Sequence, residues 1–148
     1  MKKFALLAIV AAALAFPALA LAKKVNLSGG VVKDPDSRIS LTVTMDGKEP
    51  KKITHFKLRG IDFNCKVGGK TQHFEDLGNI RITGSLSVNK TGSFKARLPN
   101  VDNKREKLRV SGVVKKGGKR VSGNVKSNKL TIAKRSCAVP KQHYELTK

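Results

Sequence analysis

Apolar and polar residues alternate along most of the chain beyond residue 22, which is the period of a β-strand with one buried face. The alternation is cleanest over residues 39–45, ISLTVTM, where every second residue is apolar. The same pattern predicts short strands over 23–32 (expected at a sheet edge), 53–65, 80–88, 94–98, 108–114, 121–126 and 130–132, and a last one around Tyr144 and Leu146 that packs on the core. These segments make about eight or nine strands.

Residues 108–126, LRVSGVVKKGGKRVSGNVK, predict a β-hairpin around Gly117-Gly118. Two glycines tolerate the positive φ that a type I′ turn needs at both central positions. The turn then sets the register of the two strands. It pairs Val110 with Val125, Gly112 with Gly123 and Val114 with Val121 on an apolar face, Arg109 with Lys126 and Lys115 with Arg120 on a polar face, and Lys116 with Lys119 beside the turn. Like charges directly opposite each other cost stability, so the polar face is expected to lie in water or against an anion.

The segment 53–65 contains a change of phase. Phe56 and Leu58 follow one phase, whereas Phe63 and Cys65 follow the other. Glycine suits a β-bulge, so we expect one long strand with a bulge at Arg59-Gly60 that puts Cys65 on the buried side. Turn residues predict reversals at 33–37, 46–47, 67–70 and 89–93, and residues 71–78 are expected to form a loop or a short edge segment.

Together these elements predict an all-β, single-domain antiparallel meander that closes into a β-barrel or a β-sandwich. The alternation does not separate the two architectures. The composition agrees, because Val and Ile dominate the apolar residues beyond position 22, and most of the 13 glycines fall between the predicted strands. Residues 23–148 have a length that suits one domain.

The first 22 residues, MKKFALLAIVAAALAFPALALA, predict a signal-peptide helix. Lys2 and Lys3 form its positive start, residues 4–16 its apolar part, and Ala20-Leu21-Ala22 a cleavage site. Cleavage near Ala22 releases a secreted or periplasmic product, and the compact leader is typical of bacteria. No later apolar run has the length of a membrane span, so we expect no transmembrane segment in the mature chain.

Cys65 and Cys137 are the two cysteines of the chain. In an exported protein, one disulfide between them is the expected state. Closing a loop of this length stabilises a fold by about 4 kcal/mol in the chain-entropy model. Two free thiols, or a nucleophilic cysteine, are the alternative.

Several of these features occur together in one group of proteins. They are the leader, a first Cys at the end of a long strand, the Asn-x-x-Gly-Ser-Phe turn at 89–94, the glycine-flanked hairpin at 112–123 and a second Cys near the C-terminus. In this respect the chain resembles small exported bacterial β-rich proteins that have one disulfide and no assigned function. The resemblance implies the β fold and a Cys65–Cys137 bridge, and it implies no catalytic residues.

The chain carries 31 Lys and Arg against 10 Asp and Glu, a formal net charge of +21. Such a charge attracts anionic polymers and lipid head groups. Cations recur on the outward phase of the predicted strands, and we expect an anion-binding surface at Arg109, Lys115, Arg120, Lys126, Lys95 and Arg97. The expected function is a non-catalytic binding or structural module that contacts anionic cell-envelope polymers or lipid head groups. A lysine-rich solubilising surface without a dedicated partner is the alternative.

Specific nucleic-acid binding is not expected. The aromatic residues beyond position 22 fall mostly in the core phase and leave no surface on which bases could stack; they are Phe56, Phe63, Phe74, Phe94 and Tyr144. Lysine also outnumbers arginine, and lysine binds phosphate without the fork of a guanidinium group.

Catalytic and metal sites have weak candidates. His55, His73 and His143 lack the short spacing to another ligand that a metal site needs, and the group of titratable residues at 73–76, HFED, is expected to be a solvated loop. We therefore expect no enzyme, no metal and no cofactor. An enzyme would need His73 or His55 beside a second polar group in a cleft. The other alternative is a small-ligand-binding β-barrel, in which a notch at Gly112 and Gly123 gives room for the ligand.

Overall fold

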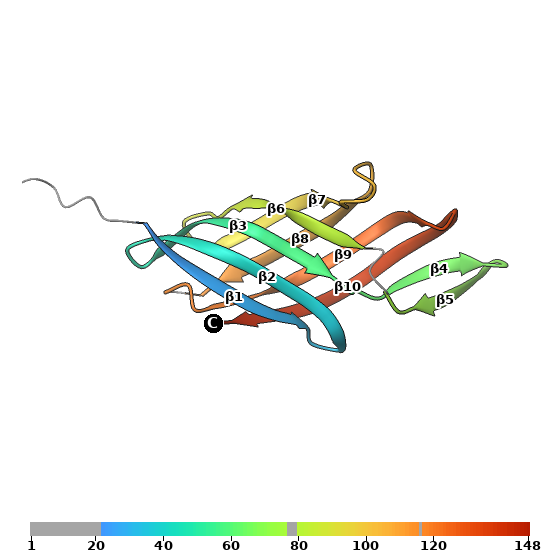
Figure 1. Ribbon diagram of the computed structural model, residues 1–148, viewed down its shortest axis with the longest axis horizontal. Coiled ribbons are helices and arrows are strands. Elements are labelled where there is room, and N and C mark those ends of the chain that lie inside the picture. The colour runs from blue at the N-terminus through green and yellow to red at the C-terminus, as the bar shows by residue number, and fades with distance from the viewer. Residues whose placement is uncertain (1–21, 77–79, 116) are drawn as a thin grey trace, which may run out of the picture.

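The computed structural model describes residues 22–76, 80–115 and 117–148. These residues form ten strands and no helix, so the all-β prediction is confirmed (Figure 1). The strands are β1 (Lys23–Val31), β2 (Asp34–Asp46), β3 (Glu49–Arg59), β4 (Phe63–Val67), β5 (Lys70–Phe74), β6 (Arg81–Ser87), β7 (Ser93–Pro99), β8 (Lys107–Val114), β9 (Arg120–Ile132) and β10 (Arg135–Thr147). The predicted signal-peptide helix lies outside the described residues. Within them, the search for a membrane-spanning helix finds none.

Eight strands form an antiparallel sheet that is nearly closed into a barrel, in the order β6-β3-β2-β1-β10-β9-β8-β7. β1, β2 and β3 are consecutive neighbours in this order, and so are β7, β8, β9 and β10. β6 lies next to β3 because β4 and β5 are outside the order. The meander prediction is therefore confirmed. At the seam, β6 meets the two residues that follow β7. Ile82 forms a bridge with Asn100, and the Val101 N–H donates a 2.7 Å hydrogen bond to the Arg81 carbonyl. Of the two architectures that the sequence allowed, the fold is the nearly closed barrel.

β4 and β5 form a hairpin that projects beyond one end of the barrel (Figure 1). β4 is attached to the first part of β10, where Cys65 pairs with Cys137 and Asn64 with Ala138. The predicted bulge at Arg59-Gly60 is therefore wrong. β3 ends there, because Gly60 has a φ of +68°. β3 pairs with β2 and β6, whereas the next strand, β4, pairs with β10. β5 is the short edge segment that one alternative predicted, and residues 77 and 78 lie outside the described part.

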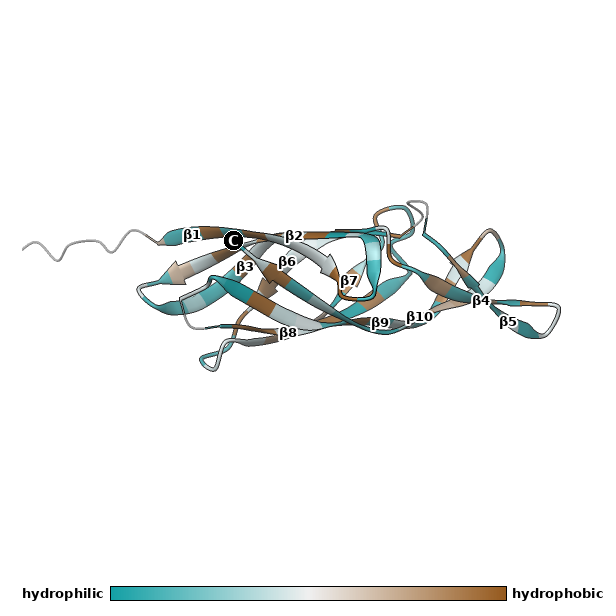
Figure 2. Cartoon of the chain, turned by 90° about the horizontal axis from the view of Figure 1, so that it is seen from below, coloured by the Kyte–Doolittle hydropathy of each residue, from teal (hydrophilic) through white to brown (hydrophobic). Residues whose placement is uncertain are grey.

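Alternation along the strands places every second residue inside the barrel (Figure 2). The predicted apolar phase of β2 is confirmed, since Ile39, Leu41, Val43 and Met45 are all buried. β10 packs on the core as predicted, with Tyr144 fully buried. The ring of Tyr144 meets Phe56 edge-on at a centroid distance of 6.5 Å, an arrangement that aromatic pairs favour.

β1 was predicted to lie at a sheet edge, and this prediction is wrong. β1 pairs with β2 on one side and with β10 on the other, in a register that runs from Ser28 opposite Thr147 to Val31 opposite Tyr144. The barrel closes on this side because the two ends of the domain pair with each other. The local pattern of residues 23–32 carries no information about a partner at the far end of the chain.

The hairpin of β8 and β9 has the predicted register, with Gly112 opposite Gly123. Both turn glycines have positive φ, +84° for Gly117 and +69° for Gly118. The Gly118 N–H donates to the Lys115 carbonyl at 2.9 Å, however, so the reversal begins one residue earlier than the type I′ turn predicted. The predicted pairing of Lys116 with Lys119 involves a residue outside the described part.

At the end of the barrel where β4 begins, three carboxylates form hydrogen bonds that join the start of β2, the β3–β4 connection and the residues after β5. Asp34 accepts hydrogen bonds from the N–H groups of Ser37 at 3.1 Å and Asp62 at 3.3 Å. Asp62 in turn accepts from the Asp76 N–H at 3.2 Å, and Asp76 accepts from the Ile61 N–H at 3.2 Å. Asp76 is 8% exposed, so the prediction of a solvated loop over 73–76 is wrong at this residue. Its carboxylate is buried because it satisfies backbone donors.

Candidate anion-binding surface

Four of the six cations predicted to bind anions gather on the outer wall of the barrel. Arg97 on β7 lies directly opposite Arg109 on β8, which lies directly opposite Lys126 on β9. Lys95 is two residues from Arg97 on β7 and opposite Ser111. We call Lys95, Arg97, Arg109 and Lys126 the β7–β9 cation face.

The other two predicted cations lie elsewhere. Lys115 and Arg120 face each other at the turn between β8 and β9, where the Lys115 N–H donates to the Arg120 carbonyl at 2.9 Å. At the rise of a β-strand, Lys115 is about 20 Å from Arg109. The predicted surface is therefore two groups, a face of four cations and a pair at the turn.

These six side chains form no ion pair and no side-chain hydrogen bond within the described residues. In that part of the chain, Lys51 and Arg81 are the cations of Lys and Arg type that pair with carboxylates. Glu106 lies beside Arg97 and Arg109, but it is buried and accepts a hydrogen bond from the Thr131 N–H. The cations of the face are thus compensated by solvent and, at longer range, by Glu106, without a direct ion pair.

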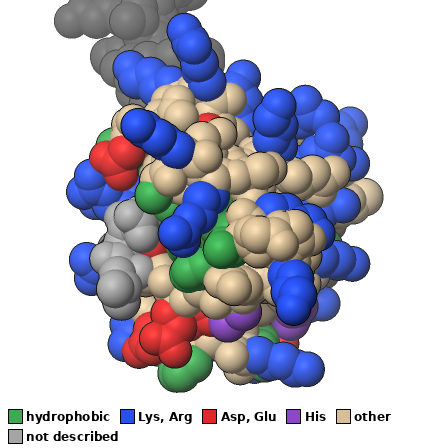
Figure 3. Space-filling view, turned by 90° about the vertical axis from the view of Figure 1, so that its right-hand side faces the viewer, with side chains coloured by type: hydrophobic (Ala, Val, Ile, Leu, Met, Phe, Trp, Pro, Cys, Tyr) green, Lys and Arg blue, Asp and Glu red, His purple; other side chains and the backbone are tan. Residues whose placement is uncertain are grey.

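A groove of about 660 Å³ borders the β7–β9 cation face. Arg105, Lys107 and Lys129 line it beside Arg97 and Arg109. Sequence reasoning missed these three residues. Arg105 and Lys107 are close together in the sequence, but only the fold brings them to Lys129. Viewed from the end that carries β4 and β5, Lys and Arg side chains spread around the molecule, whereas Asp and Glu form small groups (Figure 3).

A second row of cations crosses β2, β3 and β6. Arg38 lies directly opposite Arg59, and Arg59 lies directly opposite Arg81. We call these three residues the arginine row. No local sequence pattern indicates this row, because the three residues come from three strands whose pairing is set by the barrel.

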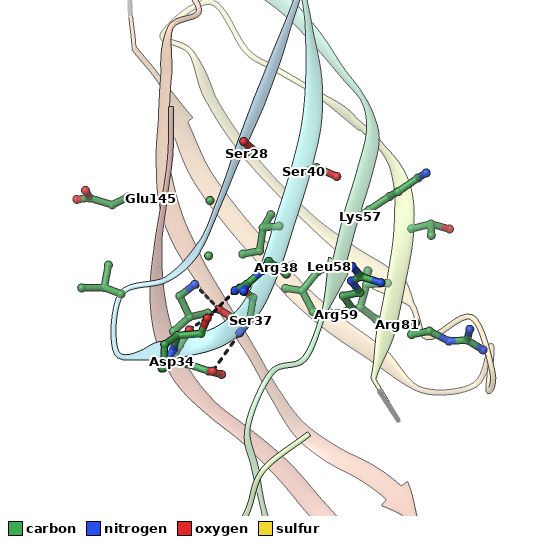
Figure 4. Close-up of a pocket in the computed structure, with 18 residues that line it drawn as sticks. Ser28, Asp34, Ser37, Arg38, Ser40, Lys57, Leu58, Arg59, Arg81 and Glu145 are labelled. Atoms are coloured by element: carbon green, nitrogen blue, oxygen red, sulfur yellow. Dashed lines mark hydrogen bonds between the residues drawn. The ribbon is translucent and has the colours of Figure 1, made fainter. Parts of the chain in front are cut away.

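The arginine row borders a groove of about 1010 Å³ on the outer wall (Figure 4). Lys57, Ser40 and Ser28 also line this groove. Arg81 donates from Nε and Nη2 to the two carboxylate oxygens of Asp102, at 3.1 and 2.5 Å. This hydrogen-bonded pair raises the pKa of Arg81 and lowers the pKa of Asp102.

The predicted disulfide is confirmed. Cys65 and Cys137 are bonded, and their Cα atoms are 4.0 Å apart across β4 and β10. Both residues are buried. The alternative of free thiols or a nucleophilic cysteine is therefore wrong, since no free cysteine is found.

Two of the three histidines, His73 and His143, line one groove together with Asp62 and Gln142. No group of three His, Cys, Asp or Glu side chains suited to a metal ion occurs in residues 22–76, 80–115 and 117–148. His73 lies between Asn64, whose Oδ1 is 3.1 Å from Nδ1, and Asp62, whose Oδ2 is 3.3 Å from Nε2. His55 is on β3 with a φ of +53°, where the register between β3 and β6 shifts.

The notch at Gly112 and Gly123 is filled. A Cβ atom added at Gly123 would lie 2.6 Å from the hydroxyl of Tyr144, and one at Gly112 would lie 2.7 Å from the ring of Phe94. The Tyr144 hydroxyl donates to the Ser111 carbonyl at 3.1 Å, and burial raises the pKa of this phenol. The glycines thus make room for a side chain of the core.

The fold defines the chain as a disulfide-bonded, antiparallel β-sheet that is nearly closed into a barrel. Comparison of the chain with family models, curated proteins and solved structures finds no match.

Proposed function

We propose that this protein is an exported, non-catalytic β-barrel that binds anionic cell-envelope material, either polymers or lipid head groups, through the β7–β9 cation face. The observation that carries the proposal is the row of Arg97, Arg109 and Lys126, three cations in register on adjacent strands that form no ion pair within the described residues. Residues directly opposite each other in an antiparallel sheet lie about 5 Å apart, so this row concentrates charge along one line of the wall.

An anionic polymer or membrane would relieve this repulsion. Each cation is desolvated little because it lies on an outward position, and the attraction is the sum of several weak contacts. Binding of this kind is strongly screened by salt, because the Debye length falls from about 30 Å at 0.01 M to about 3 Å at 1 M. The proposal therefore predicts an affinity that depends on ionic strength.

The proposed export rests on two features. The leader at residues 1–22 has the three parts of a signal peptide. The Cys65–Cys137 disulfide suits an oxidising compartment, where such bonds form and persist. We therefore propose a secreted or periplasmic location, with cleavage near Ala22.

The test is co-sedimentation of residues 23–148 with phosphatidylglycerol vesicles, and co-migration with a soluble polyphosphate, at increasing salt. The triple variant R97Q/R109Q/K126Q removes three charges from the face. The matched control K48Q/K66Q/K70Q removes three charges from exposed residues elsewhere.

We expect the wild type and the control to bind at low salt and to dissociate as salt is added. The triple variant of the face should lose most of its binding to both probes. Absence of binding by the wild type at low salt, or equal loss in the two triple variants, would contradict the proposal.

A further inference from the structure

We propose that the groove bordered by the arginine row is a discrete site for a phosphate group, with Arg59 as its central ligand. The site lies on β2, β3 and β6, on the other side of the seam from the β7–β9 cation face. The inference goes beyond the proposed function, because it concerns recognition of a single oxyanion rather than attraction to an extended charged surface.

The two outer arginines of the row are already held by oxygen atoms of the protein. Arg38 donates from Nη1 to the carbonyls of Pro35 and Ser37, and Figure 4 shows it directed toward the turn that contains Asp34. Arg81 is bound to Asp102 and is directed away from the centre of the groove (Figure 4). Each of these guanidinium groups has therefore found an acceptor.

The side chain of Arg59, between them, has no hydrogen bond and no ion pair within the described residues. Its side chain is exposed on β3, and Arg38 and Arg81 are its direct cross-strand neighbours. Like charges on neighbouring strands raise the free energy of the sheet unless an anion or solvent compensates them. An anion at Arg59 would also be attracted by Lys57, the preceding outward residue of β3.

The donors of this part of the groove suit a phosphate group. A guanidinium group offers parallel N–H donors that match two oxygens of a phosphate, and an ammonium group adds a strong point charge. Ser40 and Thr83 flank Lys57 in the sheet and supply hydroxyl groups. A phosphate, with several acceptor oxygens, can use all of these donors together.

The acidic residues of the groove narrow the position of the site. Both carboxylate oxygens of Asp34 accept backbone N–H groups, so this charge is already compensated. Glu145 lines the groove from β10 and lies 3.5 Å from His143. Its charge disfavours an anion near β10, which places the phosphate on the β3 side, next to Arg59 and Lys57.

The experiment is a titration of residues 23–148 with inorganic phosphate, followed by the ¹H–¹⁵N NMR signals of the backbone and of the arginine Nε–H groups. Three variants distinguish the charge of Arg59, the geometry of its guanidinium group and the charge elsewhere on β3 as causes of phosphate binding. R59Q removes the charge and the fork, R59K keeps the charge and removes the fork, and K52Q removes a charge from an exposed residue of the same strand that does not line the groove. The spectra also report whether each variant is folded.

We expect saturable shifts at Arg59 and Lys57 in the wild type, with K52Q binding within about twofold of it. R59K should bind about tenfold more weakly, since a lost charge-assisted hydrogen bond amounts to about one factor of ten, and R59Q should show no saturable binding. Wild-type affinity in R59Q, or equal weakening in R59Q and K52Q, would overturn the proposal. Either result means that the positive charge of the whole protein attracts phosphate without a discrete site.

Vesicles distinguish the possible sources of the phosphate. Binding to phosphatidylglycerol vesicles that falls in R59Q more than in K52Q identifies a lipid head group. If phosphate binding requires Arg59 but vesicle binding is equal in R59Q and K52Q, the ligand is a small soluble phosphate. The R97Q/R109Q/K126Q variant keeps the arginine row, so failure of the proposed function and failure of this site give different results.

Discussion

The hydroxyl of Tyr144 on β10 donates a 3.1 Å hydrogen bond to the carbonyl of Ser111 on β8. The bond crosses β9, passing over the place where Gly112 and Gly123 lie side by side. Tyr144 is fully buried and pairs in register with Gly123. One side chain of the last strand therefore fills the notch in the preceding hairpin and satisfies its own polar atom there.

The buried phenol makes alkaline titration a test of this arrangement. Burial raises the pKa of Tyr144 above the ordinary value of 10.0. Its contribution to stability is therefore fully present below pH 10.0 and is lost as the pH rises toward the folded-state pKa. The chain has one Tyr and no Trp, so ultraviolet absorbance of tyrosinate reports this residue alone. We expect no ionisation near pH 10.0 in the folded protein, and ionisation near that value in denaturant; identical titration curves would contradict the buried position.

The notch predicts unequal effects for two Gly→Ala substitutions. A Cβ at Gly123 would lie 2.1 Å from the Ser111 carbonyl oxygen, a backbone atom that cannot move freely. A Cβ at Gly84 would lie 2.7 Å from the end of the Leu98 side chain, which can shift. We expect G123A to lower the free energy of unfolding by about 1–3 kcal/mol and G84A by less. Urea unfolding of both variants measures the difference, and a larger loss in G84A would contradict this account.

The disulfide holds β4 against β10, where the register contains two residue pairs. The bridge spans a sequence separation of 72 residues. Replacing Cys65 and Cys137 with Ser should lower the free energy of unfolding by up to about 4 kcal/mol, because the unfolded chain gains freedom. Hydrogen exchange should show lost protection first in β4 and β5, while β1 and β2 stay protected. Unchanged exchange in β4 would show that the two residue pairs suffice without the bond.

The pair of Arg81 and Asp102 predicts a local dependence on pH. Arg81 lowers the pKa of Asp102 below its ordinary value of 3.8 through hydrogen bonding and charge. The stabilisation from this carboxylate is therefore present above pH 3.8 and is lost as the pH falls through the lower folded-state pKa. We expect the NMR titration of the Asp102 carboxyl to move up toward pH 3.8 in R81Q. R97Q is the control, and an equal shift in both variants would mean that the general positive field sets this pKa.

Features with local causes could be predicted from the sequence. The register of β8 and β9 follows from Gly117-Gly118 and from the alternation of Val on both sides, and the structure keeps it although the turn begins at Lys115. The buried positions of Cys65 and Tyr144 follow from the phase of their strands.

Features that depend on partners distant in the sequence could not be predicted from it. The phase change at Gly60 was visible, but a bulge and a strand end produce the same local pattern, and only the pairing of Cys65 with Cys137 shows which occurs. The pairing of β1 with β10 likewise decides that β1 is internal. The arginine row is the same case, since Arg38 and Arg59 become neighbours only through the register of β2 and β3.

β3 and β6 are neighbours in the barrel although β4 and β5 come between them in the sequence. The β4–β5 hairpin thus lies outside the order of the eight strands that form the barrel wall. Its sequence can change, lengthen or acquire new contacts while the order of the eight barrel strands stays the same. The base of the hairpin cannot change so freely, because it carries the bond from Cys65 to Cys137 and the hydrogen bonds of Asp62 and Asp76.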